Sequence, residues 1–313
     1  MSVFTTLTLD EARTWLRDFA IGEVIELRGI AAGITNTNYF VITQNARYVL
    51  TIFEKNNCED LPYFVHLMTH LAAHGVPCPA PIANNNGVAL HALKGKPALM
   101  VSCLQGKDVA TPNLVQVVEV ALTLAKLHVA GDSFKQISHN QRDQDWFVQT
   151  AQTVLPTLNL QDQMLLQSEL SFQQALDTGR LPRGVIHGDL FRDNVLFNAD
   201  MLGGFIDFYY ACHDVLAYDV AIAVNEWCLH HNGADLGNID TEKVDAFLDA
   251  YQSVRPFTAG EITMWPSLLR RAALRFWLSR LHDFHFPIKG EITHAKDPNH
   301  FKNILLARIA LLN

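Results

Sequence analysis

One segment of the chain limits its possible folds more than any other. Residues 184–208 read GVIHGDLFRDNVLFNADMLGGFIDF, and short apolar runs alternate there with Asp189, Asn194 and Asp207. Polar groups set within apolar segments cost free energy unless an interaction uses them. The apolar runs GVI, NVLF and GGFI predict short strands, so a loop and a following hairpin would bring these polar side chains together.

The order of these polar residues is typical of phosphoryl transfer. Asn194 follows Asp189 by five positions and Asp207 follows it by eighteen. A loop aspartate can orient a hydroxyl group and accept its proton, while amide and carboxylate oxygens suit Mg²⁺. The string HGDLFRDN matches the kinase pattern HRDxxxxN with Gly188 in place of arginine. The alternative is that Asp, Asn and Gly here only form turns.

The rest of the chain divides into a strand-rich part and a helical part. Strands are predicted at 23–33, 39–44 and 47–54, a helix at 60–74, and further strands around an Asn-Gly turn before residue 104. Helices are predicted at 114–131, 143–156, 160–178, 216–230, 241–253, 260–285 and 298–312. We therefore expect an α+β protein with a small lobe over 1–104 and a larger, mainly helical lobe over 105–313.

Composition and charge narrow the classes of partner and of cellular environment that we expect. The chain has 313 residues, a formal net charge of -8 and five cysteines with no CxxC pair. These values do not predict a nucleic-acid surface or a disulfide framework, and they fit a reducing cytoplasm. The N-terminus does not read as a signal peptide; Thr8–Glu11 predicts a capping box instead. We expect no membrane span, and the sequence does not predict an oligomeric state.

The motifs resemble those of the aminoglycoside phosphotransferase and choline kinase-like family. HGDxxxxNxL followed by an IDF strand is the hallmark of that family, and LAKLH (124–128) and YDVA (218–221) also match. The resemblance covers nearly the whole chain. It implies a two-lobed, protein-kinase-like fold, with a nucleotide-binding lobe over 1–104 and a catalytic and substrate-binding lobe over 105–313.

The resemblance also implies roles for particular residues. Asp189 would be the catalytic base, Asn194 and Asp207 would bind Mg²⁺, and ATP would be the co-substrate. The ATP would lie between the lobes, with its adenine against the connecting segment that contains Val101 and Cys103.

Within the family, the chain looks most like members that phosphorylate the side-chain hydroxyl of L-homoserine. The closer match lies in four segments: 33–41, 50–55, 206–228 and 270–283. The alternatives are another small acceptor (choline or ethanolamine, methylthioribose or an aminoglycoside) and a nucleotide-binding pseudokinase.

The predicted phosphate-binding loop departs from the kinase pattern. The turn GIAAGITNTN contains no GxGxxG, but its backbone N–H groups near Gly33, Thr35 and Asn36 could bind phosphates. An ordinary turn is the alternative. Thr51 stands where kinases carry a phosphate-binding lysine, which leaves the cation for the ATP phosphates open and keeps the pseudokinase alternative.

Acceptor contacts are predicted near the C-terminus. Arg275 and Arg280 lie on an apolar helix, where an unpaired guanidinium is costly, and arginine binds carboxylates in a bidentate fork. The alternative is a structural ion pair with one of four acids: Asp214, Asp219, Glu226 or Asp283. Asn225 and Trp227 are further candidate pocket residues, with a place in the core as the alternative for the aromatic ring.

Several histidines have a structural interpretation. His66, His70 and His74 share one helical face, and an exposed face is favoured there over a metal site. His128 and His187 are predicted to support the catalytic lobe and its loop, with a direct proton role as the alternative for His187. Asp219 is predicted to brace a loop or to begin a helix.

Overall fold

The computed structural model describes residues 4–30, 36–54, 60–230, 237–287 and 296–311. The chain forms two compact units. Unit 1 is Met1–Gln105 with Gly203–Ile206, and unit 2 is Gly106–Leu202 with Asp207–Asn313. Unit 1 is built around a sheet and unit 2 is mainly helical, which confirms the predicted α+β class. The division of nucleotide and substrate binding between 1–104 and 105–313 stays a prediction.

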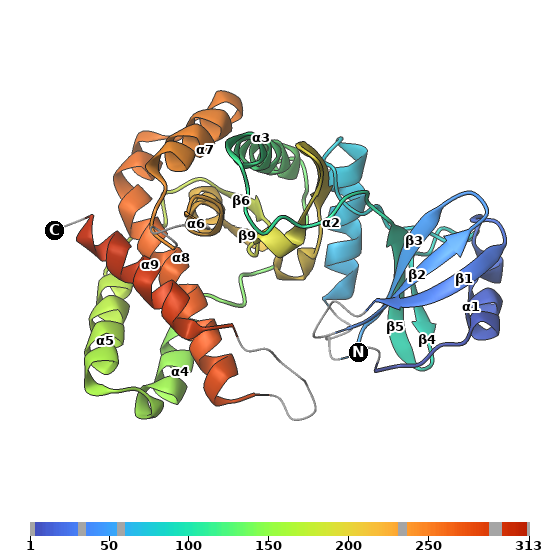
Figure 1. The fold of residues 1–313 in the computed structure, drawn as a ribbon, viewed down its shortest axis with the longest axis horizontal. Helices are drawn as coiled ribbons and strands as arrows, with labels where there is room; N and C mark the ends of the chain where they lie inside the picture. The colour runs from blue at the N-terminus through green and yellow to red at the C-terminus, as the bar shows by residue number, and fades with distance from the viewer. Residues whose placement is uncertain (1–3, 31–35, 55–59, 231–236, 288–295, 312–313) are drawn as a thin grey trace. The chain divides into compact units, whose positions relative to one another are not determined.

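Unit 1 contains one antiparallel sheet in the strand order β1-β2-β3-β5-β4 (Figure 1). The strands are Val24–Ile30 (β1), Thr37–Thr43 (β2), Arg47–Ile52 (β3), Leu90–Leu93 (β4) and Lys96–Ser102 (β5). Helix α1 (Leu9–Trp15) continues into the 3₁₀ turn η1 (Leu16–Asp18), and α2 (Leu61–Ala73) follows β3. The predicted capping box at Thr8 and Glu11 begins α1.

The two faces of this sheet differ in chemistry. Leu50 and Ile52 of β3 are fully buried in a core that includes residues of α1. Side chains alternate along a strand, so Thr51 between them lies on the opposite face. The Thr51 hydroxyl donates to Asn38 Oδ1 on β2 at 2.8 Å. The residue at the expected lysine position is therefore part of a cross-strand hydrogen bond.

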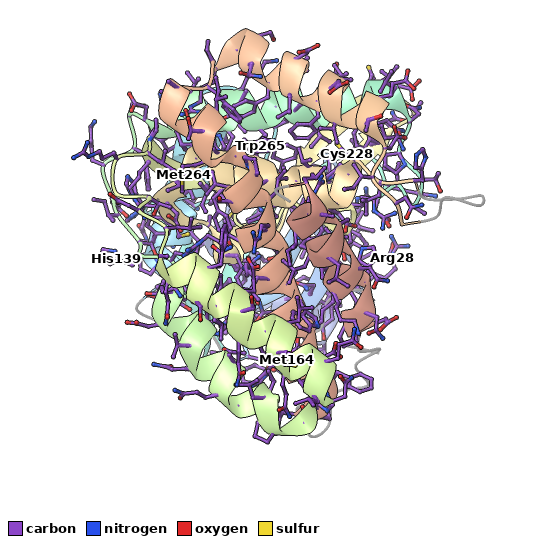
Figure 2. The ribbon with its side chains drawn as sticks, turned by 90° about the vertical axis from the view of Figure 1, so that its left-hand side faces the viewer. Arg28, His139, Met164, Cys228, Met264 and Trp265 are labelled. Atoms are coloured by element: carbon purple, nitrogen blue, oxygen red, sulfur yellow. The ribbon has the colours of Figure 1, made fainter. Side chains whose placement is uncertain are left out.

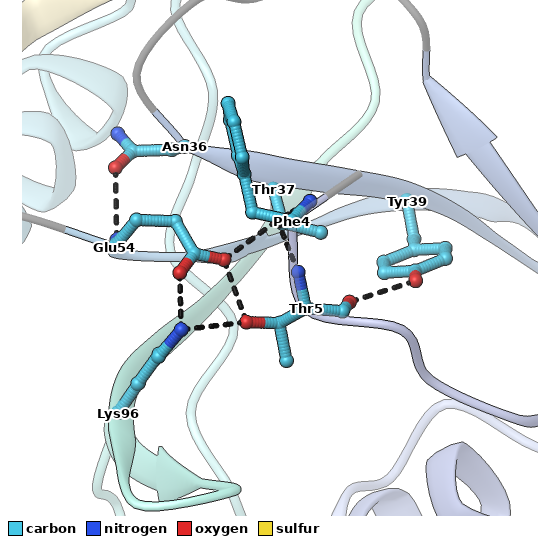
Figure 3. A network of polar contacts seen from close by, with 7 residues as sticks. All are labelled: Phe4, Thr5, Asn36, Thr37, Tyr39, Glu54 and Lys96. Carbon is cyan, nitrogen blue, oxygen red and sulfur yellow. Dashed lines mark hydrogen bonds and ion pairs between the residues drawn. The ribbon is translucent and has the colours of Figure 1, made fainter. Parts of the chain in front are cut away.

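A polar network attaches the N-terminal segment to the edge of this core (Figure 3). Glu54 accepts hydrogen bonds from the hydroxyls of Thr5 and Thr37, each at 2.7 Å. Lys96 forms an ion pair with Glu54 and donates to the Thr5 hydroxyl at 2.8 Å. Burial alone would raise the pKa of Glu54, but these hydrogen bonds and the Lys96 charge hold it below its usual value. The network thus stabilises a carboxylate that is almost completely buried.

Removing the ammonium group should destabilise unit 1. We expect Lys96→Met to lower the free energy of unfolding by about 1–3 kcal/mol, because the Glu54 carboxylate loses its charged partner. Lys94→Met is the matched control, since Lys94 pairs with Glu11 on the surface, where ion pairs contribute little. Urea unfolding of both variants at neutral pH tests this, and equal midpoints would contradict it. The folded pKa of Glu54 lies below its unfolded value, so the difference should vanish as the pH falls below about 4.

The hairpin between β4 and β5 corrects one sequence prediction. The Asn-Gly turn at Asn86–Gly87 precedes β4 and does not join two strands. The connection is made at Lys94 and Gly95, which both have positive φ, at 51° and 77°. Two consecutive positive φ angles suit a two-residue hairpin turn. A lysine in the left-handed region is uncommon, and the sequence pattern therefore did not reveal this turn.

Unit 2 consists mainly of helices (Figure 1). They are Leu114–Gly131 (α3), Gln144–Val154 (α4), Leu160–Gln174 (α5), Leu216–Trp227 (α6), Thr241–Val254 (α7), Ala259–His285 (α8) and Pro298–Ala310 (α9), with the 3₁₀ turn Leu155–Thr157 (η2) after α4. These bounds confirm the seven helices predicted for this part of the chain. Every residue of α6 is buried. Figure 2 shows α5 at the surface, where Met164 is mostly exposed.

Two short two-stranded sheets hold the segment that the sequence singled out. Its strands are Arg183–Ile186 (β6), Val195–Asn198 (β7), Met201–Phe205 (β8) and Cys212–Val215 (β9), with 3₁₀ turns Arg192–Asn194 (η3) and Phe208–Tyr210 (η4). β6 pairs with β9 and β7 with β8. The sequence predicted the first three strands but not β9, whose four residues precede α6 directly.

Helix α3 is apolar enough to cross a membrane by length and composition alone. Its 18 residues have a mean hydropathy of 1.5, yet 56% of that stretch is buried inside the protein. Val117, Val120, Leu124 and Leu127 have no exposed surface. These contacts make α3 a core helix of unit 2.

Candidate active site

The loop between β6 and β7 carries the predicted base. Asn194 Nδ2 donates to both the backbone oxygen of Asp189, at 2.8 Å, and its carboxylate, at 3.1 Å. Asn194 is nearly buried, whereas Asp189 remains partly exposed. The two residues that the motif pairs are thus in direct contact, and the Asn194 amide fixes one oxygen of the Asp189 carboxylate.

A buried aspartate on α6 holds the start of this loop. Asp219 has no exposed surface and accepts the backbone N–H groups of His187, at 2.7 Å, and Gly188, at 2.8 Å. His128 of α3 contacts the same carboxylate at 3.1 Å, and Tyr251 contacts the other ring nitrogen of His128 at 2.7 Å. The predicted bracing roles of Asp219 and His128 are confirmed by these bonds.

The charge of Asp219 is kept despite its burial. Burial would raise the pKa of Asp219, but the hydrogen bond and charge of His128, helped by the Gly188 N–H, lower it overall. Burial lowers the pKa of His128 against the opposing effect of Asp219. An ionised Asp219 can accept both loop N–H groups at once.

Steric constraints explain why the HGD motif has a glycine at position 188. Gly188 has φ +74°, and a Cβ atom there would lie 2.8 Å from the carbonyl oxygen of Tyr210. Side chains rarely adopt this φ, and no real Cβ approaches backbone so closely. The arginine of the kinase pattern is therefore excluded at this position by the Tyr210 backbone.

Substitution of this glycine should damage the loop. We expect Gly188→Ala to lower the free energy of unfolding by about 2–4 kcal/mol and to lower the phosphotransfer rate, because strain and a backbone clash add. Gly75→Ala is the control: Gly75 has nearly the same φ, +77°, but nothing lies within 4 Å of its Cβ position. Unfolding midpoints and initial rates of both variants measure the clash separately from the strain. Equal losses in the two variants would refute the role of the Tyr210 carbonyl.

Asp207 is the third oxygen-bearing side chain of the motif, after Asp189 and Asn194. It directly precedes η4 and adopts a left-handed conformation, with φ 62° and ψ 61°. Its side chain reaches solvent. Desolvation by the surrounding protein and then the negative charge of Asp189 raise the pKa of Asp207 to about 7. Two carboxylates close enough to disfavour each other's charge form a site that a cation would stabilise.

A buried guanidinium lies beside the predicted base, Asp189. Arg275 of α8 is 4% exposed, and its Nη1 lies 3.7 Å from Asp189 Oδ1. This Nη1 has no hydrogen-bond partner, while the guanidinium packs on the rings of Tyr210 and Phe276. Burial raises the pKa of Asp189, and the Arg275 charge opposes this rise. The acids weighed as ion-pair partners for Arg275 were the wrong ones, because the nearest carboxylate is that of Asp189.

The other predicted acceptor residues have protein partners. Asn225 is fully buried, donates to the Leu269 carbonyl at 2.9 Å and accepts from Arg308 at 2.9 Å. Trp227 is also fully buried and donates to the Leu190 carbonyl at 2.9 Å. Their burial places both in the core of unit 2, so we propose them as supports of the site instead of acceptor contacts.

Two further arginines of unit 2 have protein partners. Arg280 donates to the Asp297 carbonyl at 3.3 Å and stacks over Phe301, so its role toward an acceptor stays a prediction. Arg192, which sequence reasoning did not single out, forms an ion pair with Glu226 of α6 at 2.8 Å. This pair and the Trp227 hydrogen bond attach the loop between β6 and β7 to α6. The burial of Glu226 would have indicated that Arg192 has an ionic partner, but burial cannot be seen in the sequence.

The predicted nucleotide residues belong to unit 1. Gly33 and Thr35 lie outside the described residues. Asn36 is buried, and its Oδ1 accepts the Glu54 backbone N–H at 3.3 Å. Val101 lies on β5, and the Cys103 sulfur accepts a hydrogen bond from Arg47 at 3.2 Å. Their contacts with ATP stay predictions.

The histidine face of α2 forms no three-ligand cluster. The rings of His70 and His74 lie 4.1 Å apart, and His74 Nδ1 bonds to the His70 carbonyl at 2.8 Å. Within the described ranges no group of three or more His, Cys, Asp or Glu side chains could hold a metal ion.

The fold and this site together define a class of protein. A sheet-based unit, a helical unit and a loop aspartate followed by asparagine and a second aspartate are the parts of a kinase-like phosphotransferase. The chain belongs to the phosphotransferase enzyme family, whose sequence model matches residues 26–257.

Relatives along the whole chain carry one activity in their names. The chain is 54% identical over 310 residues to the homoserine kinase of Methylobacillus flagellatus, which covers 99% of this chain and 96% of the relative. It is 50% identical to the homoserine kinase of Methylobacillus glycogenes, with the same coverage.

Solved structures share the fold at low sequence identity. A choline kinase from Cryptosporidium parvum superposes with a TM-score of 0.70 at 15% identity, covering 97% of this chain and 96% of that one. An amicoumacin kinase in complex with AMP-PNP, Ca²⁺ and Ami gives a TM-score of 0.72 at 13% identity, with 96% and 94% coverage. These likenesses confirm the predicted protein-kinase-like fold.

Proposed function

We propose that this protein transfers the γ-phosphoryl group of ATP to the side-chain hydroxyl of L-homoserine. The observation that carries the proposal is the likeness to homoserine kinases, at 54% identity over 99% of the chain. The site adds the chemistry. Asp189 would accept the hydroxyl proton, since it is partly exposed and its carboxylate is held by Asn194. A pKa raised by burial makes this carboxylate a stronger base.

The side-chain oxygens of Asn194 and Asp207 are suitable ligands for Mg²⁺. Asn194 uses its amide nitrogen toward Asp189, which leaves its amide oxygen for a cation. Asp207 reaches solvent, and the negative charge of Asp189 disfavours its ionisation unless a positive charge is near. We propose that Asn194 and Asp207 hold Mg²⁺, which would neutralise phosphate charge when bound.

Arg275 is proposed to recognise the acceptor. Its Nη1 lies beside Asp189 and lacks a hydrogen-bond partner. A guanidinium near the base suits an acceptor that carries a carboxylate close to its hydroxyl, as L-homoserine does. Choline and ethanolamine have no carboxylate, so the buried cation favours L-homoserine over them.

A comparison of two acceptors tests this assignment. ADP release would be measured with L-homoserine and with 3-amino-1-propanol, which lacks the carboxylate. We expect the wild-type protein to prefer L-homoserine by at least about tenfold in kcat/KM, and Arg275→Met to lose most of that preference. The ratio cancels any effect of Arg275 on the basicity of Asp189. Absence of turnover on L-homoserine would refute the proposed reaction, whereas an unchanged ratio in Arg275→Met would refute only the role of Arg275.

A further inference from the structure

A second pocket lies in unit 2, apart from the candidate active site. Its volume is about 320 Å³, the size of a small-molecule site. It is lined by the segment before α4, the first turn of α4, β9 and the middle of α8, and His139, labelled in Figure 2, lies on its wall. Asp189, Asn194, Asp207 and Arg275 are absent from its lining.

Two hydrogen-bond donors in this pocket lack the partners that buried groups normally have. Tyr218 is 2% exposed, and its hydroxyl has no hydrogen-bond partner. The amide nitrogen of Gln144 is buried and also has none. Buried polar groups are almost always hydrogen-bonded, and leaving one unsatisfied costs about 1–3 kcal/mol. Two such atoms on residues that line one pocket indicate a ligand that supplies the acceptors.

The third donor brings a positive charge. Arg271 contacts Gln144 Oε1 at 3.4 Å, and its guanidinium lies over the rings of Phe147 and Tyr218. Within the described part of the chain no carboxylate forms an ion pair with Arg271. A hydroxyl, an amide N–H and an unpaired guanidinium in one pocket are complementary to a carboxylate.

The three aspartates that line the pocket differ in whether they already have partners within the protein. Asp214 already pairs with Arg183 at 2.7 Å, and Asp143 caps α4 through the Trp146 N–H at 3.0 Å. Asp145 is exposed, and its side chain has no hydrogen bond or ion pair with the described residues. A ligand that meets the donors with a carboxylate can therefore place an ammonium group toward Asp145.

We propose that this pocket binds a small α-amino acid separately from the phosphotransfer site. Tyr218, Arg271 and Gln144 bind its carboxylate. Asp145 lies on the side of the ammonium group. Arg275, one helical turn beyond Arg271 on α8, is not among the residues that line the pocket and lies beside Asp189.

The probe for this site is L-2-aminobutyrate, which has both charged groups of an amino acid and no hydroxyl to phosphorylate. We expect isothermal titration of the full chain to show its binding, weakened at least about tenfold in Tyr218→Phe and in Arg271→Lys. Tyr218→Phe removes only an unpartnered hydroxyl and should leave stability and the KM for L-homoserine unchanged. Butyrate should still bind, and propylamine should not.

Arg275→Gln is the matched control, because it alters the proposed acceptor contact and should keep the binding. The proposal would be overturned by no binding of L-2-aminobutyrate or butyrate to the wild-type protein, or by binding that survives Tyr218→Phe but is lost in Arg275→Gln. A rise in the KM for L-homoserine in Tyr218→Phe would also overturn it, since the pocket would then belong to the acceptor site. The titration needs no turnover, so its outcome is distinct from that of the proposed reaction.

Discussion

Asp189→Asn should lower kcat by about 10²–10⁴-fold while the protein stays folded. The amide keeps the shape of the side chain but cannot take the proton of an acceptor hydroxyl. Asn194 can still donate to the Asp189 backbone oxygen, so the loop keeps one of its two bonds. Charge neutralisation and positioning by the rest of the site would account for the residual rate.

The neighbouring acid provides the control for this variant. Asp193 is exposed and pairs with Lys296 on the surface, so Asp193→Asn removes the same charge without touching the base. Circular dichroism and urea unfolding would establish that both variants fold, and initial rates of ADP release would give kcat. A wild-type kcat in Asp189→Asn would exclude Asp189 as the base and with it the predicted chemistry of the motif.

The local features of the fold could be predicted from the sequence because neighbouring residues determine them. The capping box at Thr8 and Glu11 begins α1, and the apolar period over 114–131 gives α3 with the predicted bounds. The contact between Asp189 and Asn194 follows in the same way, since only four residues of a tight loop separate them. Such features need no knowledge of the remaining chain.

Contacts between distant elements could not be predicted. Asp219 lies 32 residues from His187 and 91 from His128. The pairing of β6 with β9 before α6 and the packing of α3 against α6 bring them together. The same limit explains Asn225 and Trp227. A helix buried on every side carries its polar residues inward as structural partners, and in a sequence they look like pocket residues.

For Arg275 the sequence predicted that the residue matters but did not predict its partner. A guanidinium on an apolar helix must have a reason, and the sequence therefore indicated that Arg275 is a functional or paired residue. Its partner, Asp189, lies 86 positions away and was not among the four acids weighed, because only the packing of unit 2 places α8 against the loop. Tyr218 stood out only as part of the YDVA match, and the sequence did not indicate that its hydroxyl lacks a partner.

The second large effect is expected at Asp219, which touches no substrate. Its carboxylate accepts two consecutive loop N–H groups and the His128 ring within a fully buried site. In Asp219→Asn one oxygen becomes an NH₂ donor that faces another donor, so at least one buried group loses its partner. We expect the free energy of unfolding to fall by about 2–5 kcal/mol, and kcat by about 10²-fold as the loop that carries Asp189 shifts.

Glu261→Gln separates these two effects. Glu261 is equally buried and ionically paired, with Arg255 at 2.8 Å, but it caps α8 and does not contact the loop. It should lose stability and keep kcat per folded molecule, whereas Asp219→Asn should lose both. The dependence of the free energy of unfolding on pH at low pH provides a further check. Because the folded pKa of Asp219 lies below its unfolded value near 3.9, its contribution is complete above about pH 4 and disappears as the pH falls further. If Asp219→Asn kept a normal kcat, the loop would not need its brace, and the position of Asp189 would have to be set by Asn194 and Trp227.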